Sequence, residues 1–206
     1  LQMSASVSEG AYRAHIVHTN FYSPQSQFEL SHLRGDFAFD ERGISVKNTI
    51  IQSARSYLEV DASLRGLHLL ENFSLENLQH DSAEVQVRAK NIDFGELKSF
   101  IPQVDFLEGS ALVDLNAGGE FGNLILKHVN VHTYGSTFNL SGNMRNLHRP
   151  EDLFLDVLIG DSRIIPSDAA RLLPTFHLPT FDSVGQVSFF SEYIGKPLNF
   201  KARTSL

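Results

Sequence analysis

The sequence predicts a mainly β protein whose sheet is repeated and strongly curved and carries two short helices. Three observations predict this fold class. Apolar and polar residues alternate through most of the 206 positions, a long block of this alternation occurs twice, and two short stretches have apolar residues at helical spacing. Alternation indicates strands with one buried face, because successive side chains of a strand point to opposite sides of the sheet.

Residues 47–78 and 127–158 are two copies of one block, related by a shift of eighty positions without a gap. Eight of the thirty-two aligned positions are identical: Lys47/Lys127, Ser56/Ser136, Arg65/Arg145, Leu67/Leu147, His68/His148, Glu71/Glu151, Leu75/Leu155 and Leu78/Leu158. A repeat indicates a unit that is stable only when neighbouring units cover its apolar face. The chain therefore divides into a weakly patterned lead-in, a first repeat, a second repeat and the start of a third, at residues 1–26, 27–103, 104–178 and 179–206.

Short strands are predicted wherever the alternation runs. They cover residues 14–18 in the lead-in and then residues 28–30, 37–39, 44–46, 49–52, 57–64, 84–90 and 111–117. Turns are predicted where small, polar and glycine residues interrupt the pattern, at residues 34–35, 40–43, 53–56 and 118–119.

Each repeat is predicted to contain one short helix. In residues 94–101, Phe94, Leu97, Phe100 and Ile101 stand at helical spacing and Pro102 ends the run. The counterpart at residues 165–174 has Pro166 near its start and Pro174 just past its end, which are the places where helices tolerate proline.

Two short helices are too few to cover the apolar faces of all these strands. Either two sheets close on each other as a sandwich, or one strongly curved sheet leaves its apolar face lining a groove. We expect this face to carry Leu58, Val60, Ala62, Leu64, Val85, Val87, Val129, Val131, Phe138, Leu140, Leu153, Leu155 and Val157. A long apolar trough without convergent polar groups suits acyl chains better than a soluble metabolite, which needs placed hydrogen-bonding groups. Phe138, at the centre of the second copy, is the strongest single candidate for the lining.

Composition excludes several classes of function. The formal net charge is −7, so the chain has no basic footprint for nucleic acid, and it has no cysteine for a disulfide or a thiolate metal site. We see no transmembrane span and no signal-peptide pattern, and we expect the chain to be an internal segment of a longer protein.

Three segments resemble the TamB branch of the AsmA-like proteins. They are LRGDFAF at residues 33–39 followed by GISVK at 43–47, the block at residues 122–147, and the helix, proline and strand passage at residues 172–185. The resemblance implies a taco-shaped β-groove in the periplasm of a bacterial cell, in a parent protein anchored to the inner membrane. It also implies phospholipid transport towards the outer membrane, and it implies a role in outer-membrane protein assembly, with a β-barrel partner contacted by regions outside this chain.

Catalytic and metal chemistry find little support. His128 and His132 are four residues apart on a predicted strand, about 13 Å, which is too far for two ligands of one ion. His15 and His18 are predicted on opposite faces, and all nine histidines are interpreted as exposed polar positions of a sheet. No nucleophile elbow, phosphate loop or dinucleotide fingerprint occurs, so we expect no enzyme, no cofactor and no metal.

The sequence thus predicts a non-enzymatic segment that binds lipid acyl chains in a hydrophobic β-groove and contacts neighbouring repeats of the same chain. The alternative is a structural or protein-interaction β-repeat scaffold, for example in outer-membrane protein assembly. The two differ in whether the apolar face is open or closed.

Overall fold

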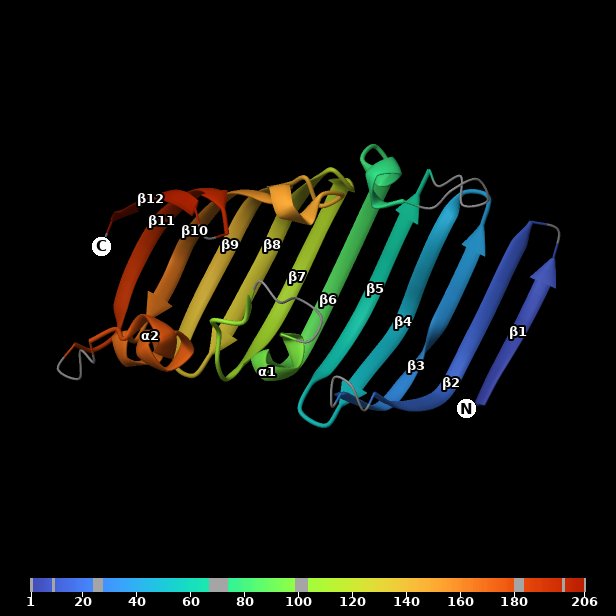
Figure 1. Ribbon diagram of the computed structural model, residues 1–206, viewed down its shortest axis with the longest axis horizontal. Helices are drawn as coiled ribbons and strands as arrows, with labels where there is room; N and C mark the ends of the chain where they lie inside the picture. The colour runs from blue at the N-terminus through green and yellow to red at the C-terminus, as the bar shows by residue number, and fades with distance from the viewer. Residues whose placement is uncertain are drawn as a thin grey trace.

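The structure is a computed structural model that describes residues 2–8, 10–23, 28–66, 74–98, 104–179, 184–197 and 199–205. In these residues the strands form one twelve-stranded sheet, ordered from β1 to β12 as in the sequence. Every neighbouring pair is antiparallel. The strands lie side by side with the two chain ends at opposite ends of the sheet (Figure 1), and the sheet does not close. The described strands therefore build no sandwich.

The strands have these bounds: β1 Gln2–Ser8, β2 Ala11–Ser23, β3 Phe28–Asp40, β4 Gly43–Ser53, β5 Tyr57–Arg65, β6 Ser82–Asp93, β7 Ser110–Glu120, β8 Asn123–Thr133, β9 Ser136–Arg145, β10 Phe154–Ile164, β11 Val187–Lys196 and β12 Asn199–Ser205. The described residues also form two α-helices, α1 (Phe94–Leu97) and α2 (Pro166–Leu172), and the 3-10 helices η1 (Leu75–Leu78), η3 (Pro150–Asp152) and η4 (Pro174–Phe176).

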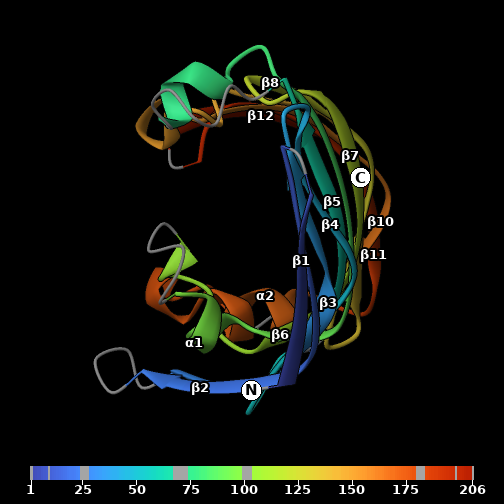
Figure 2. The same ribbon diagram turned by 90° about the vertical axis from the view of Figure 1, so that its right-hand side faces the viewer.

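Seen along its long axis, the sheet curls into a C with the helices on its concave side (Figure 2). Helices α1 and α2 stand along one rim, and the 3-10 turns that follow β5 and β9 stand along the other (Figures 1 and 2). The mainly β, curved fold with two short α-helices is confirmed.

β-Bulges contribute to this curvature, because an extra residue in one strand bends it and increases its twist. The register shifts in every strand pair except β11 with β12. In β4 the shift against β5 lies between Val46 and Thr49, and in β8 the shift against β9 lies between Leu126 and Val129. These positions are eighty residues apart, so the register shift occurs at the same place in both copies of the repeat.

The internal repeat is present, but its gapless alignment is right only as far as Arg65 and Arg145. Strands β5 and β9 end at these residues, whereas β6 and β10, and likewise α1 and α2, correspond at a shift of seventy-two. Sixteen residues separate β5 from β6, and eight separate β9 from β10. The predicted pairs Leu75/Leu155 and Leu78/Leu158 are therefore wrong, because the first copy places these leucines in η1 and the second places them in β10.

Several predicted strands are too short. The lead-in contains two strands, β1 and β2, and β1 is exposed along its whole length, so no apolar alternation marks it. The turn predicted at residues 34–35 is a bulge within β3, and Gly118 and Gly119 lie inside β7, one residue before the turn at 121–122. In each case backbone pairing continues through small residues that sequence reasoning takes as breaks.

The helix at residues 165–174 is confirmed, since α2 begins at Pro166 and ends before Pro174. The first helix is shorter than predicted, because α1 ends at Leu97, and the predicted contributions of Phe100, Ile101 and Pro102 lie outside the described residues. Asp93 caps α1 by accepting a hydrogen bond from the Glu96 N–H at 3.0 Å.

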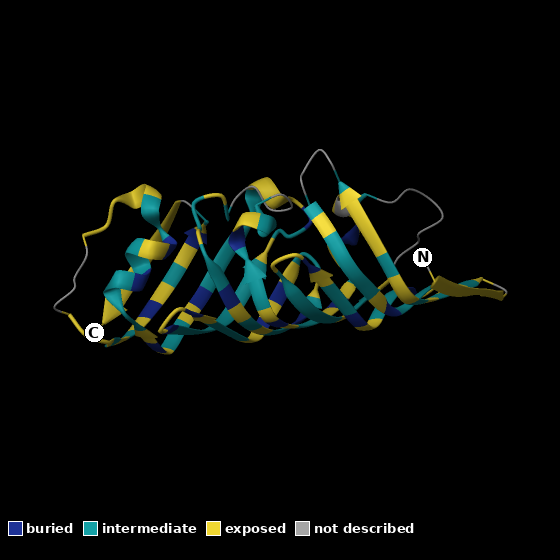
Figure 3. Ribbon diagram, turned by 90° about the horizontal axis from the view of Figure 1, so that it is seen from below, coloured by how far each residue is buried: buried dark blue, intermediate teal, exposed yellow. Residues whose placement is uncertain are grey.

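The apolar core is divided into two clusters along the concave face. One joins Phe94 of α1, Ala111 of β7 and Leu172 of α2, and the other joins Ala117, Leu126 and Val157 of the sheet. Buried and exposed positions alternate along the central strands, whereas the N-terminal edge is exposed (Figure 3). The helices thus cover one rim of the sheet and leave the middle of the face to the strands.

Replacing Gly142 tests how closely β9 and β10 pair. Its φ is 142°, and a Cβ there would meet the Asp156 carbonyl oxygen at 2.2 Å. We expect Gly142→Ala to lower the free energy of unfolding by about 1–3 kcal/mol, because the side chain combines backbone strain with a clash against main chain. Urea unfolding measures the loss. The control is Gly185→Ala, where a Cβ meets nothing within 4 Å and we expect no loss; equal losses would contradict this account.

Candidate functional site

Strand pairing aligns apolar residues into rows that cross the concave face. The first row runs Leu58, Ala89, Val113, Val131, Phe138. The second runs Val60, Val87, Leu115, Val129, Leu140, Ile159. The third runs Phe37, Val46, Ala62, Val85, Ala117, Leu126, Gly142, Val157. The fourth runs Phe39, Ile44, Leu64, Ala83, Gly119, Leu124, Met144, Leu155. Val113 and Val131 pack with Phe94 of α1, which places these rows on the side of the helices.

Twelve of the thirteen predicted lining residues stand in these rows, and one does not. Leu153 follows η3 at the rim and belongs to no strand. The prediction omitted the aromatic row residues of β3 and most of the row residues of β7 and β8, although these three strands show the same alternation. Phe138 pairs with Val131 and packs edge-on against Phe189, with ring centroids 6.1 Å apart.

The face is covered only in part. Of the thirteen predicted residues, Val157 is buried at 6% exposure, and the other twelve are half-buried. A closed core would bury large side chains such as Leu58, Leu140 and Phe138 almost completely. The arrangement is therefore an apolar trough whose walls are the curved sheet and the helices on its rims.

An apolar cavity lies against α1. It has a volume of about 330 Å³ and is lined by Phe28, Leu30, Ile51, Ser53, Ser56, Leu58, Ile92, Glu96 and Leu97. Its polar members hydrogen-bond to one another: Ser53 and Ser56 donate to a Glu96 carboxylate oxygen at 2.5 and 2.6 Å. The cavity wall is thus almost purely hydrocarbon, and it offers a ligand dispersion and burial with little hydrogen bonding.

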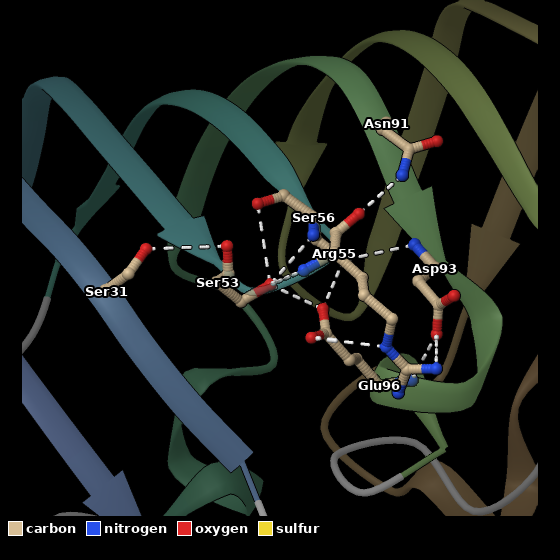
Figure 4. Close-up of polar contacts among 7 residues, drawn as sticks. All are labelled: Ser31, Ser53, Arg55, Ser56, Asn91, Asp93 and Glu96. Atoms are coloured by element: carbon tan, nitrogen blue, oxygen red, sulfur yellow. Dashed lines mark hydrogen bonds and ion pairs between the residues drawn. The ribbon is translucent and has the colours of Figure 1, made fainter.

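A polar clasp holds α1 at this place (Figure 4). The Ser56 hydroxyl accepts a hydrogen bond from the backbone N–H of Asp93 at 3.0 Å while it donates to Glu96. Arg55 lies 3.3 Å from the Asp93 carboxylate and 3.7 Å from that of Glu96, and the Asn91 amide donates to the Arg55 carbonyl. The turn between β4 and β5 is thereby tied to the start of α1.

The second copy has the same clasp in a buried form. The Ser136 hydroxyl accepts from the backbone N–H of Ile165 at 2.9 Å and donates to the Asp168 carboxylate at 2.8 Å. Ser136 is 0% exposed and Asp168 is 4% exposed. Asp93 and Ile165 are the residues that precede α1 and α2, so the repeated serine fixes each helix at its first turn. This gives the identity of Ser56 and Ser136 a physical reason.

Two groups near the C-terminal end have shifted pKa values. Partial burial raises the pKa of Tyr193, which stacks on Phe200 with centroids 4.5 Å apart. The Lys196 ammonium, 2.8 Å from the Asp152 carboxylate, holds the pKa of that carboxyl below its usual range by hydrogen bonding and charge. This exposed pair joins η3 to β11 at the rim.

The interpretation of the histidines as exposed positions of a sheet is confirmed for His15, His18, His128 and His132. His80 and His177 are exposed but lie on turns, His32 is half-buried on β3, and the interpretation is wrong for His148. That residue is 4% exposed, lies on the turn before η3, and its Nδ1 has no hydrogen-bond partner among the described residues. A Cβ on Gly122 would stand 3.3 Å from this nitrogen, so the missing side chain of Gly122 makes room for the imidazole. His15 donates from Nδ1 to the Asp36 carboxylate at 2.6 Å, and His68 lies outside the described residues.

Comparison of the chain with protein-family models, curated proteins and solved structures found no match. Within the described ranges, no group of three or more His, Cys, Asp or Glu residues is arranged to hold a metal ion. None of the helices in the described part of the chain is long and apolar enough to span a membrane.

Removing the buried clasp should loosen α2. We expect Ser136→Ala to lower the free energy of unfolding by about 2–3 kcal/mol, because a buried carboxylate loses a charge-assisted hydrogen bond. Ser56→Ala should cost about 1 kcal/mol, since Ser53 continues to donate to Glu96. Chemical unfolding measures both. Ser188→Ala on exposed β11 serves as the control, and a larger loss for Ser56 than for Ser136 would contradict the comparison.

Proposed function

We propose that this chain is a non-enzymatic segment that binds lipid acyl chains along the concave face of its sheet. The observation that carries the proposal is the set of apolar rows that cross β3 to β10. In these rows Ala83, Ala89, Ala117, Leu124, Leu126 and Val157 are buried, and the other members are only half-buried. Exposed apolar area of this extent favours a hydrophobic ligand, because covering it removes hydrocarbon from water. The trough presents little to orient a polar metabolite.

The cavity against α1 is the best-formed part of the proposed acyl site. It is lined by aliphatic and aromatic side chains from four successive strands, β3 to β6, and from the helix, and its serines and glutamate are already hydrogen-bonded. An acyl chain there would gain about 0.8 kcal/mol for each methylene buried. Such binding needs no geometry at the headgroup, so the trough would accept acyl chains of different lipids.

We extend the proposal to the setting that the family resemblance implies. In a TamB-like protein the trough would conduct phospholipid passively through the periplasm of a bacterial envelope, with its direction set elsewhere. Support for this setting is the curved sheet itself, together with the three sequence segments. Assembly of outer-membrane proteins with a β-barrel partner belongs to the same setting.

A structural scaffold is the second candidate, and the edges of the sheet favour it. Among the described strands, β1 pairs with β2 alone and β12 with β11 alone, so each end presents a row of backbone groups without a strand partner. Such edges pair readily with another strand. Neighbouring repeats of the same chain would satisfy both edges and lengthen the sheet.

Photo-crosslinking separates an acyl trough from a scaffold. A benzophenone side chain at Phe138 faces the trough, and one at Ser141 on the outer face of the same strand is the matched control, since Ser141 pairs with the exposed Leu158. We expect irradiation with phospholipid vesicles to attach lipid at Phe138 and little at Ser141, as read by mass spectrometry. Protein adducts alone, or equal lipid at both sites, would favour the scaffold.

Filling the cavity should weaken binding without unfolding the chain. Ile51 lines the cavity, and its neighbour Ile50 is opposite Glu59 on the other face of β4. We expect Ile51→Trp to reduce the affinity for a fluorescent fatty acid at least tenfold, because the indole occupies the space of the acyl chain. Ile50→Trp should leave the affinity unchanged. Circular dichroism confirms folding of both variants, and equal affinities would place the acyl site elsewhere.

A further inference from the structure

Two β-bulges meet on the convex face near the N-terminal edge of the sheet. Pairing between β2 and β3 steps from Ile16 opposite Gly35 to Thr19 opposite Leu33, so two residues of β2, including His18, stand against Arg34. Pairing between β3 and β4 steps from Leu30 to His32, and Ser31 is the extra residue. Each histidine is thus next to or within a bulge, and bulges turn side chains away from the regular alternation.

The two bulges bring His18 and His32 into contact. Their Nδ1 atoms are 2.6 Å apart, and their ring centroids are 4.8 Å apart with the planes tilted by 32°. His18 is exposed and His32 is half-buried, so solvent and solutes reach the pair. The sequence alone did not join them, because fourteen residues separate them and the contact depends on both register shifts.

The contact restricts the protonation of the pair. One Nδ1 must carry a proton and donate it to the lone pair of the other, since two imidazolium rings would oppose two donors and two positive charges. When both rings hold their proton on Nε2, both Nδ1 lone pairs are free and lie close together. That is the state in which imidazole binds a metal ion.

We propose that His18 and His32 form a two-histidine site for a divalent transition-metal ion. Each ring supplies one Nδ1 ligand, and water completes the coordination. Metal–nitrogen bonds of about 2.0–2.1 Å place two cis ligand nitrogens about 3 Å apart. Side-chain rotation that widens the present separation of 2.6 Å by a few tenths of an ångström and turns both Nδ1 atoms toward a common point meets this geometry. Imidazole pairs suit Cu²⁺, Ni²⁺ and Zn²⁺, and Cu²⁺ should bind most tightly.

The surroundings set the strength of this site. The described residues supply no third close ligand, and His15 on the same strand is already paired with Asp36. Arg34 stands opposite the bulge of β2, and its positive charge opposes a cation. We therefore expect weaker binding than at a site with three or four protein ligands. A bound ion would join β2 to β3 at the point where both strands leave regular register.

Calorimetric titration of the untagged, metal-free chain with Cu²⁺ and Ni²⁺ tests the site independently of lipid binding. We expect one ion per chain, with Cu²⁺ tighter than Ni²⁺ and full reversal by a chelator. His18→Gln and His32→Gln should each weaken binding at least tenfold, because one of the two ligands is lost. His128→Gln is the matched control, since that histidine is exposed on β8 and should bind no ion alone.

Thermal unfolding supplies a second readout. Ni²⁺ should raise the midpoint of the wild-type chain and of His128→Gln, and should not raise that of His18→Gln or His32→Gln, because only a bound ion bridges the two strands. The proposal is overturned if the wild-type chain binds no tighter than the two ligand variants. It is also overturned if His15→Gln removes binding while His32→Gln retains it, because the ligands are then different residues.

Discussion

The structure depends on one constraint, which is that an antiparallel meander with a single apolar face must cover that face with whatever the same chain supplies. The twelve strands of the described residues follow one another in sequence order in one sheet, and these residues form no second sheet to pack against it. The chain meets the constraint by bending, with bulges at equivalent places in each copy, and by folding two small helices over one rim. The bulges and the helices leave the half-buried residues of the apolar rows partly uncovered.

The serine clasps show that a few polar side chains are enough to fix each helix to the rim of the sheet. In each copy one serine hydroxyl accepts a hydrogen bond from the backbone N–H of the residue before the helix, and it donates a hydrogen bond to a carboxylate of that helix. The donors to Glu96 are Ser53 at the end of β4 and Ser56 in the turn after it, and the donors to Asp168 are the Gly135 N–H and the Ser136 hydroxyl at the start of β9. Each helix therefore cannot shift along the rim without leaving a charge short of donors. The first copy adds Arg55 and borders a cavity, whereas the second is buried. Both clasps hold helices that share one core cluster, to which α1 contributes Phe94 and α2 contributes Leu172.

The fold class was predictable because alternation reports directly on strands with one wet face, and Pro166 and Pro174 bracket α2. Strand ends were less predictable. Gly35, Gly118 and Gly119 lie inside strands, since pairing between backbones passes through them, and β1 carries no apolar pattern because it buries nothing. Twelve of the thirteen predicted residues from Leu58 to Val157 could be placed in the apolar rows for the same reason that the strands could be predicted, and their contact with lipid stays a prediction. Contacts that depend on register, such as His18 with His32 or Ser136 with Asp168, were not, because a bulge changes which residues face each other.

The order of elements that repeats is three strands, a 3-10 helix, a fourth strand and an α-helix, and it determines the length of the sheet. Neighbouring strands are about 4.8 Å apart, so each unit advances the sheet by about 19 Å along its axis. Because every strand pairs only with its neighbours in sequence, adding a unit changes no existing contact except at the edge where it joins. The number of units therefore determines the length of such a trough, and the fold of a single unit determines its cross-section.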